Sequence, residues 1–307
     1  MGFLETLFGK KKLDYQKKYL LQKAAISGTM SRFFQATDRE TGQLVGLKII
    51  DAQKMKQVEA RIRTAYGKVH KPSEGEITAS FNHPYIVKVF DYGLTTRNEP
   101  YIVMEYLEGT GLNNILMVRQ NMLAGAYLHY IRQCAEALKE VHDKGYIHRD
   151  YCPRNLLFTG DGTALKLIDF GLTVPNCPPF TDPGNRTGTA NYMAPELVRR
   201  KPTSTKLDIF SFGVTMYELC CRQLPWPGGQ GGLAAMGHDT PATPITTYFP
   251  NIHPVLAKAI HQCIQPDVRD RCESMQDFLR LISRCDSETA DKAPPVILKP
   301  ETKATSR

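Results

Sequence analysis

The pattern of apolar and polar residues predicts strands in the first part of the chain. Residues 33–50 (FFQATDRETGQLVGLKII) indicate two strands joined by a turn at DRETGQ, because alternating and β-branched residues flank turn-forming ones. Residues 85–93 and 100–109 are short apolar stretches of strand length. Residues 53–69 instead have apolar residues three and four positions apart, which predicts a helix.

A helical pattern dominates the second part. Residues 126–145 have apolar residues at helical spacing and end in Gly145, a typical helix stop. Residues 207–221 are so apolar that we expect a buried helix, and residues 254–265 and 274–285 predict two amphipathic helices. The pattern therefore divides the chain into a strand-rich front of about 110 residues and a helix-rich back of about 175.

The composition is that of an ordinary globular protein. Of 307 residues, 42% are apolar and 23% are charged, which excludes a wholly disordered chain, a collagen-like fibre and a small disulfide scaffold. No apolar run reaches the roughly 18 residues that a membrane-spanning helix needs. The first residues, MGFLETLFGKKK, lack the cleavage pattern of a signal peptide, so we expect a cytoplasmic location. None of the eight cysteines forms a C-x-x-C pair, which argues against a zinc site. Without an export signal we expect the thiols to be reduced.

The net charge of +8 is concentrated in two stretches. Residues 1–23 carry six Lys, and residues 48–71 carry seven Lys or Arg. Such basic faces suit nucleic acid, an anionic membrane or a polyphosphate ligand. No RNA-binding aromatic motif accompanies them, so we expect no specific nucleic-acid partner. Met1, Gly2 and Thr6 fit a short N-myristoylation pattern, but we do not expect membrane attachment.

Four motifs carry the chemistry. VGLK (45–48) stands upstream of HRDYCPRN (148–155), which is followed fourteen residues after its last residue by DFG (169–171) and then by APE (194–196). In this order and at this spacing they resemble the lysine-bearing strand, the catalytic loop, the metal-binding loop and the end of the activation segment of eukaryotic-type (Hanks-type) Ser/Thr protein kinases. The resemblance covers residues 20–284.

This resemblance implies an α+β, two-lobed protein kinase-like fold. A small lobe of about residues 20–105 would hold an antiparallel β-sheet and one main helix, and a large, mainly α-helical lobe would span about residues 110–284. Residues 1–19 would form a basic N-terminal extension. Residues 285–307 would form a flexible tail, because the chain becomes polar and Pro-containing there.

The resemblance also implies a function, the transfer of the γ-phosphoryl group of ATP to Ser or Thr hydroxyls of protein substrates. Asp150 resembles the catalytic base, which accepts the proton of the substrate hydroxyl. Asn155 and Asp169 offer hard oxygen ligands for Mg²⁺, with Mn²⁺ as an alternative.

Lys48 resembles the lysine that contacts the ATP phosphates. Its partner in the family is a glutamate nine residues before the His of an H-P dipeptide, and counting back from His83 gives Glu74. Glu76 is the close competitor, because the stretch between Lys48 and Glu74 is several residues longer than usual.

The loop that would cover the nucleotide departs from the family pattern. The three glycine positions of the family fall on Ile26, Gly28 and Ser31, so only Gly28 remains. Because glycines let backbone N–H groups approach phosphates, the two lost glycines predict a stiffer or more distant lid. In addition, Phe33 stands where Val is usual and Gly46 where Ala is usual.

The adenine pocket otherwise resembles that of the family. Met104 takes the gatekeeper position, and Leu157 takes the place of the apolar floor. Glu105 and Leu107 are the hinge residues whose backbone groups would bind the adenine edge. The alternative for each of these residues is a plain role in the core.

The catalytic loop departs from the Ser/Thr pattern at Cys152, where the family carries a Lys that reaches the γ-phosphate. Arg154, which matches an Arg of tyrosine kinases, would supply that charge, since a guanidinium can bind phosphate bidentately. The alternative is a solvent-facing Arg154 and a buried Cys152. Gly188-Thr189 nevertheless resembles the G-T of Ser/Thr kinases, whose threonine hydrogen-bonds the catalytic Asp, so we expect Ser/Thr specificity.

Further residues resemble the structural supports of the family. Asp208 would anchor the catalytic loop through backbone hydrogen bonds. Glu196 would pair with Arg271 as a buried ion pair. His148 and Phe170 would stack in the core.

The resemblance also suggests a regulatory site. Arg149 would be an uncompensated cation, and a phosphate on the activation segment would pair with it. Thr181 and Thr187 are the candidate phosphorylation sites of that segment. Thr187 is favoured because it follows Arg186 and lies nearer the segment's end.

Two other functions stay open. The eroded glycine loop would suit a pseudokinase, an ATP-binding scaffold without catalysis. A small-molecule phosphotransferase of related fold is the second, although it would need neither APE nor the G-T pair. Neither the protein substrate nor the oligomeric state follows from the sequence.

Overall fold

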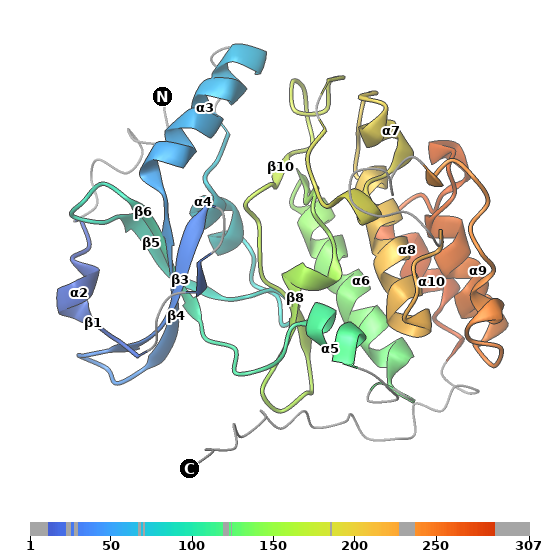
Figure 1. Ribbon diagram of the computed structural model, residues 1–307, viewed down its shortest axis with the longest axis horizontal. Coiled ribbons are helices and arrows are strands. Elements are labelled where there is room, and N and C mark those ends of the chain that lie inside the picture. The colour runs from blue at the N-terminus through green and yellow to red at the C-terminus, as the bar shows by residue number, and fades with distance from the viewer. Residues whose placement is uncertain are drawn as a thin grey trace. The chain divides into compact units, whose positions relative to one another are not determined.

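The chain folds into two compact units, made of Met1–His83 with Val87–Leu107 and of Pro84–Ile86 with Glu108–Arg307 (Figure 1). The computed structural model describes residues 12–22, 26–27, 30–66, 69, 71–118, 123, 125–184, 186–226 and 237–285. Residues 1–11, the loop residue Gly28 and the tail from residue 286 onward lie outside the described residues.

The first unit is built on an antiparallel sheet, as the sequence predicts. Its strand order is β1-β3-β4-β6-β5, and β2 also pairs with β3. The strands are β1 (Tyr19–Leu21), β2 (Ile26–Ser27), β3 (Ser31–Asp38), β4 (Leu44–Ile50), β5 (Val89–Leu94) and β6 (Pro100–Glu105). The predicted hairpin of residues 33–50 is confirmed as β3 and β4. Its turn is set by Asp38, whose Oδ1 accepts the N–H groups of Glu40 and Thr41, and by Gly42 at a φ of 70°.

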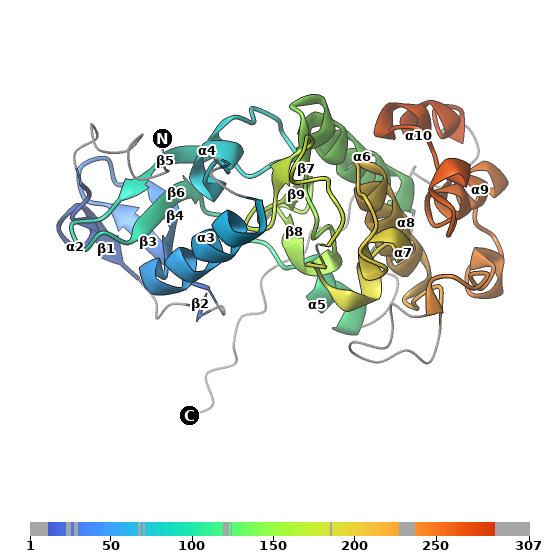
Figure 2. The same cartoon turned by 90° about the horizontal axis from the view of Figure 1, so that it is seen from above.

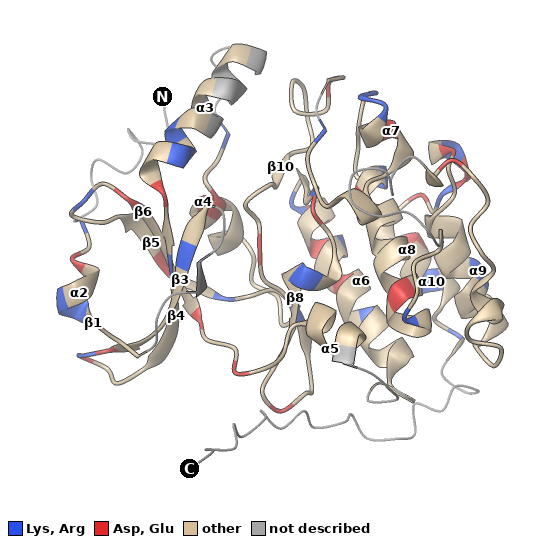
Figure 3. Cartoon of the chain, viewed as in Figure 1, with Lys and Arg blue, Asp and Glu red and all other residues tan. Residues whose placement is uncertain are grey.

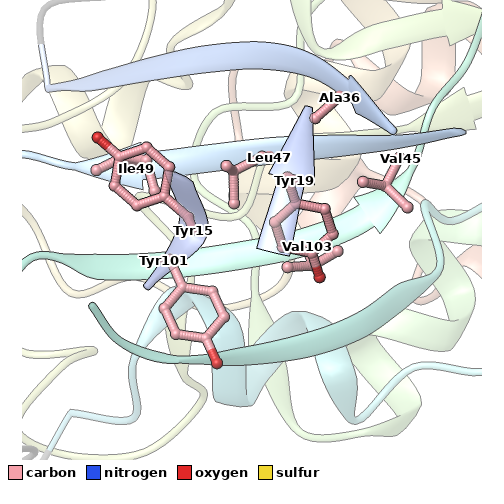
Figure 4. Close-up of a cluster of buried hydrophobic side chains, with 8 residues drawn as sticks. All are labelled: Tyr15, Tyr19, Ala36, Val45, Leu47, Ile49, Tyr101 and Val103. Atoms are coloured by element: carbon pink, nitrogen blue, oxygen red, sulfur yellow. The ribbon is translucent and has the colours of Figure 1, made fainter. Parts of the chain in front are cut away.

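The two faces of this sheet have different roles. One face packs a cluster of buried side chains (Figure 4): Tyr15, Tyr19, Ala36, Val45, Leu47, Ile49, Tyr101 and Val103. The opposite face carries Lys48, because residue i and its cross-strand partner point to the same side and neighbours alternate. Lys48 pairs with Phe33, and Gly46 pairs with Met104, so these four residues share the Lys48 face.

The N-terminal segment belongs to the folded unit earlier than expected. The sequence assigned residues 1–19 to an extension, but α2 (Tyr15–Lys18) and β1 already form part of the unit. Tyr15 and Tyr19 are 5% and 3% exposed within the cluster of Figure 4. In the described part of this segment the basic residues are Lys12, Lys17 and Lys18, and the last two lie in the last turn of α2, which Figure 3 shows in blue. Burial of two aromatic rings therefore makes residues 15–19 structural.

Two helices follow β4 in the first unit, where one main helix was expected. α3 (Ala52–Tyr66) matches the helix predicted over 53–69, and α4 (Glu74–Ala79) is separate (Figure 2). Pro72 lies just before the second helix and cannot continue the first. α4 then begins with a capping box, in which Ser73 and Glu76 satisfy each other's backbone N–H groups.

The second unit is mainly helical, also as predicted. Its helices are α5 (Leu112–Val118), α6 (Tyr127–Asp143), α7 (Pro195–Val198), α8 (Lys206–Cys221), α9 (Pro254–Cys263) and α10 (Met275–Leu281). Its short strand pairs are β7 (Tyr146–Ile147) with β10 (Val174–Pro175), and β8 (Leu156–Phe158) with β9 (Leu165–Leu167). The 3-10 turns in the described part of this unit are η1 (Pro153–Asn155), η2 (Ala190–Tyr192), η4 (Ile245–Thr247) and η5 (Val268–Asp270).

α8 is the centre of the second unit. The predicted buried helix is confirmed, since nearly all its residues are buried, and it packs against α6 and α9 (Figures 1 and 2). α10 packs against α6 and α9 in turn. α6 ends before Gly145 at a φ of 79°, the left-handed stop that the sequence predicts. Along the described part of the chain, no helix is long and apolar enough to span a bilayer.

The expected ion pair between Glu196 and Arg271 is present and buried. Both guanidinium Nη atoms lie 2.8 Å from the two carboxylate oxygens of Glu196. Arg271 also donates to the carbonyls of Lys206, Gln265 and Pro266. The pair therefore joins α7, the start of α8 and the segment after α9 through one fully hydrogen-bonded cation.

Removing one partner of this pair should destabilise the protein strongly. Glu196→Ala leaves the Arg271 cation buried without its counter-charge, which costs about 3–5 kcal/mol of unfolding free energy. Arg280→Ala is the matched control, because the Arg280–Asp277 pair is exposed, and such pairs contribute about 0–1 kcal/mol. Urea unfolding followed by circular dichroism measures both variants. Equal small losses would contradict a structural role for the buried pair.

Candidate active site

The backbone of the HRD loop is held by the buried carboxylate of Asp208. The N–H of His148 donates to its Oδ2 at 2.7 Å, and the N–H of Arg149 donates to its Oδ1 at 2.8 Å. Arg149 has a φ of 70°, in the left-handed region that non-glycine residues rarely adopt. The anchoring expected of Asp208 is thus present, and it fixes the backbone immediately before Asp150.

Asp150 receives hydrogen bonds on both carboxylate oxygens. Its Oδ1 accepts from the N–H of Thr189 at 2.9 Å and from the Thr189 hydroxyl at 2.6 Å. Its Oδ2 accepts from Arg154 Nη2 at 3.1 Å and from Asn155 Nδ2 at 3.2 Å. Four donors thus fix the direction of the carboxylate, while 12% of the side chain stays exposed.

Arg154 bridges the Asp150 carboxylate and the Thr189 hydroxyl. Its Nη2 also donates to the Thr189 hydroxyl at 2.7 Å, so that hydroxyl accepts from Arg154 and donates to Asp150. The Arg154 side chain is 61% exposed, and Cys152 beside it is buried with its Sγ 3.7 Å from Thr189 Oγ1. The structure therefore shows the buried Cys152 of the alternative interpretation together with an Arg154 that contacts Asp150.

Thr189 reaches Asp150 because glycine precedes it. Gly188 has a φ of 130°, and a Cβ at this position would lie 2.7 Å from the carbonyl oxygen of Arg149. Only a residue without a side chain lets the activation segment come this close to the HRD loop. The G-T pair noted in the sequence thus has a steric reason as well as a polar one.

Asn155 and Asp169 are brought together by a short hairpin. Asn155 directly precedes β8, and Asp169 follows β9 by two residues; the two strands pair with Leu156 opposite Leu167. The N–H of Ile168 donates to the carbonyl of Asn155 at 3.0 Å. Asn155 Nδ2 donates to the carbonyl of Asp150 as well as to its carboxylate, so the side-chain nitrogen of Asn155 is committed to Asp150.

The DFG segment is tied to the HRD loop by His148. His148 Nε2 lies 2.7 Å from the carbonyl oxygen of Asp169. The ring of His148 meets that of Phe170 edge to face, with centroids 5.3 Å apart and planes at 72°, and both rings are buried. The Asp169 carboxylate accepts the N–H of Gly171 at 3.0 Å. The contact expected between His148 and Phe170 is present as an edge-to-face pair.

In the first unit, Lys48 pairs with Glu74. Lys48 Nζ lies 2.5 Å from Glu74 Oε1, and the two side chains are 14% and 12% exposed. Glu76 serves the capping box of α4 instead. The geometry therefore favours Glu74 over its competitor as the partner of Lys48.

The expected adenine residues divide between the two units. Met104 is buried at 6% exposure next to Gly46. The N–H of Glu105 donates to the carbonyl of Lys88, so this N–H does not serve an adenine edge. Leu107 is half-buried at the end of the first unit, and Leu157 is half-buried in β8 of the second.

The glycine loop is described only in part. The backbone of Ile26 pairs with Phe33 in β2, and Gly28 lies outside the described residues. The structure therefore leaves the expected lid as a prediction.

Arg149, the expected partner of a regulatory phosphate, is buried beside the activation segment. Its side chain is 4% exposed, and its guanidinium donates to the carbonyl of Phe180. Phe180 directly precedes Thr181, which is half-buried, and the carbonyl of Thr181 accepts the N–H of Thr203. Packing of the activation segment thus gives the Arg149 guanidinium a neutral polar partner, and its pairing with a phosphate stays a prediction. Thr187 is half-buried and carries no such link to Arg149 among the contacts described.

Comparison with known proteins decides the family. The protein kinase domain profile matches residues 23–280. The chain belongs to the protein kinase domain family.

The similar proteins include kinases of bacteria and vertebrates. The serine/threonine-protein kinase PknA of Mycobacterium tuberculosis (strain ATCC 25618 / H37Rv) is 31% identical over 239 residues, covering 76% of this chain and 54% of PknA. The human hormonally up-regulated neu tumor-associated kinase is 35% identical over 190 residues, covering 61% of this chain and 25% of that protein. The chain thus spans about half the length of PknA and less of the human relative.

A contact of Asp208 with α6 in this kinase domain was not predictable from the sequence. His142, in the last turn of α6, places Nε2 3.0 Å from Asp208 Oδ2. Asp208 is therefore held from the α6 side as well as by the HRD loop. The only signal in the sequence was a His in the last turn of a predicted helix, which is too common to assign.

Cys177 should react with an alkylating reagent in the native protein, whereas Cys152 should not. Burial, followed by the nearby Asp150 charge, raises the pKa of the Cys152 thiol to about 11. Burial raises that of Cys134 to about 12. All eight cysteines are described, and Cys177 is the exposed one. Because only an accessible thiolate alkylates readily, iodoacetamide at neutral pH should modify Cys177 alone.

Mass spectrometry of the native protein checks this expectation. One adduct should form, and Cys177→Ser should remove it. An adduct on Cys152 before unfolding would contradict the burial of the loop.

Proposed function

We propose that this chain is an ATP-dependent protein kinase that phosphorylates Ser and Thr hydroxyls of protein substrates. The observation that carries the proposal is the Asp150 carboxylate, held by Thr189, Arg154 and Asn155 through four hydrogen bonds. The family match and the printed name of PknA support the same activity.

Asp150 is the proposed base of the reaction. Its carboxylate accepts the proton of a substrate hydroxyl as the hydroxyl oxygen attacks the γ-phosphorus and the bond to the ADP oxygen breaks. Positioning of this kind accounts for much of the rate, because phosphoryl transfer asks little covalent chemistry of the protein. The four donors on Asp150 hold its carboxylate in one direction and use about four lone-pair sites, so a substrate hydroxyl would take the place of one of them.

The donor set fits a divalent cation that prefers oxygen. Asn155, just before β8, supplies an amide oxygen, and Asp169, two residues after β9, supplies carboxylate oxygens at the same open end of the hairpin. No group of three His, Cys, Asp or Glu side chains suited to a metal occurs among the described residues. Mg²⁺ is usually held by one or two carboxylates together with substrate phosphates, and Asn155 and Asp169 would share it with ATP in this way. When bound, Mg²⁺ neutralises phosphate charge. Lys48, oriented by Glu74, is the proposed further cation for the phosphates.

The G-T pair favours a protein substrate with a Ser or Thr hydroxyl. Thr189 contacts Asp150 through both its backbone and its side chain. Through this contact the activation segment lies next to the proposed base, at the place where the hydroxyl of a peptide substrate must bind. A small-molecule phosphotransferase would need no such coupling.

Arg154 is proposed to replace the lysine that the family carries at Cys152. Its guanidinium already contacts Asp150 and Thr189, and its side chain is 61% exposed, so Arg154 can turn toward a phosphate at little cost in desolvation. Cys152 cannot supply charge, because burial keeps its thiol protonated at neutral pH.

A phosphate on Thr181 or Thr187 is the proposed regulator of the activation segment. Arg149 contacts the carbonyl of Phe180, next to Thr181. Phosphorylation adds close to two negative charges and strong acceptors, which would replace that carbonyl as the partner of Arg149.

The direct test is incubation of the purified chain with γ-labelled ATP, Mg²⁺ and a generic protein substrate. Label should appear on phosphoserine and phosphothreonine. Asp150→Asn should lower the rate by a factor on the order of 10² or more, because the amide cannot accept the proton. Asp161→Asn is the control, since Asp161 lies in an exposed turn after β8.

The other outcomes identify the alternatives. ATP binding without transfer would indicate a pseudokinase scaffold. Label confined to a sugar or an antibiotic would indicate a small-molecule phosphotransferase.

The proposed replacement of the family's lysine by Arg154 gives a second prediction. Arg154→Ala should reduce kcat by a factor on the order of 10², and Cys152→Ala should have a smaller effect because its thiol is neutral. Cys152→Lys in the Arg154→Ala background should restore part of the loss. Equal, small effects of the two single variants on kcat would reject the proposed role of Arg154.

A further inference from the structure

The exposed charges at the end of the activation segment are all of one sign. From Pro183 to Lys201 the sequence carries four basic residues and one acid. The acid, Glu196, is buried in its pair with Arg271. The four basic residues are exposed: Arg186, Arg199, Arg200 and Lys201. This stretch of the second unit therefore presents a basic surface.

Arg199 differs from the other three because its charge is already compensated. Its guanidinium pairs with the carboxylate of Asp239. Within the part of the chain that the structure describes, Arg186, Arg200 and Lys201 form no ion pair. We call these three residues the basic cluster. Their charges remain available to a ligand from outside the chain.

Two backbone hydrogen bonds bring the members of the basic cluster together. The N–H of Gly184 donates to the carbonyl of Arg200 at 3.0 Å, and the N–H of Thr203 donates to the carbonyl of Thr181 at 2.9 Å. The two segments therefore run antiparallel, with Gly184 opposite Arg200. Arg186 follows Gly184 by two residues, which span at most about 7 Å. Arg186 thus lies beside the residues that follow α7, which Figure 3 shows in blue.

Arg186 is also close to the proposed base. It stands three residues before Thr189, and three residues span at most about 11 Å. Thr189 contacts the Asp150 carboxylate through both its N–H and its hydroxyl. A substrate hydroxyl bound at Asp150 therefore has Arg186 within the length of a few substrate residues.

We propose that the basic cluster selects substrate peptides that carry Asp or Glu within a few residues of the acceptor Ser or Thr. This inference rests on the proposed kinase function and names the class of its substrate. Complementary charges across an interface favour the matching partner, and like charges disfavour the wrong one. A guanidinium can bind a carboxylate bidentately, so Arg186, which is nearest to Thr189 along the chain, should contribute most.

The carboxylates of this region do not oppose the selectivity. Glu218 accepts the hydroxyl of Tyr192 at 2.5 Å, and burial raises the pKa of Glu218, so its side chain offers little charge to a basic peptide. Asp182 is exposed but stands seven residues before Thr189, beyond Gly184. The exposed charges nearest to Thr189 on its own segment are therefore positive.

The first experiment compares three peptides as substrates of the purified chain. Each has one Ser among alanines, and the Ser is flanked by Asp, by Ala or by Lys. The kcat/KM of the Asp peptide should be about tenfold above that of the Ala peptide, because each exposed charge pair contributes a few-fold. The Lys peptide should be the poorest. The difference should lie mainly in KM, since the basic cluster contacts the flanking residues and not the phosphate.

Charge reversal tests the residues themselves. Arg186→Glu and Lys201→Glu should each lower the ratio of kcat/KM for the Asp peptide to that for the Lys peptide several-fold. The double variant should invert the preference. Lys258→Glu is the matched control, because Lys258 is exposed on α9 and its reversal changes the net charge equally. Equal changes in Arg186→Glu and Lys258→Glu would overturn the local role of the cluster.

The salt dependence of the wild-type chain needs no variant. Raising the ionic strength from 0.1 to 1 M shortens the Debye length from about 10 to about 3 Å. The ratio between the Asp and Lys peptides should then fall toward one, because the cluster acts through exposed charges. A ratio that is independent of salt would contradict recognition by charge.

The outcomes separate this inference from the proposed function. If the wild-type chain phosphorylates the three peptides equally, the role of the basic cluster is wrong and the kinase activity stands. If it phosphorylates none of them and no generic protein substrate, both are wrong. If the preference for Asp appears only after phosphatase treatment, the cluster binds a phosphate of the activation segment, and the proposed substrate class is wrong.

Discussion

The second unit depends on one buried carboxylate, that of Asp208 at the start of α8. It accepts the backbone N–H groups of His148 and Arg149 and contacts His142 from α6. Two neighbouring N–H groups converge on one side chain here, and Arg149 adopts a φ of 70°, a conformation that costs about 1–3 kcal/mol for a residue with a side chain. The hydrogen bonds to Asp208 offset that cost and set the direction in which the Asp150 side chain extends from the loop.

The contacts of the neighbouring site residues depend on the direction of the Asp150 side chain. Once Asp150 is fixed, its carboxylate is within reach of Thr189 only because Gly188 passes against the Arg149 carbonyl. Asn155 is held from the other side by the hairpin that also places Asp169. The proposed base, the proposed metal ligands and Thr189 are thus parts of one hydrogen-bonded network. Its members act together, so the loss of one donor is expected to disturb the others.

Much of this could be predicted from the sequence, because the spacing of the motifs carries it. Asp150, Asn155 and Asp169 stand at fixed distances along the chain, and so does the glutamate counted back from His83. What the sequence could not predict depends on contacts across strands and between distant segments. Tyr15 and Tyr19 are polar-tipped residues among lysines, and only the sheet reveals the face that buries them. Similarly, the close approach of the Phe33 ring to Gly46 appears only when the register of β3 and β4 is known.

The central claim is that Asp208 holds the HRD loop and thereby aims Asp150. Hydrogen–deuterium exchange of the His148 and Arg149 amides, compared between wild type and Asp208→Asn, tests it most directly. Asn offers one oxygen acceptor, and its NH₂ group faces a backbone donor, so at least one amide should lose protection. The account predicts slow exchange of both amides in wild type and fast exchange of at least one in Asp208→Asn, together with loss of phosphoryl transfer. Equal protection in the two proteins, or full activity of the variant, would contradict it.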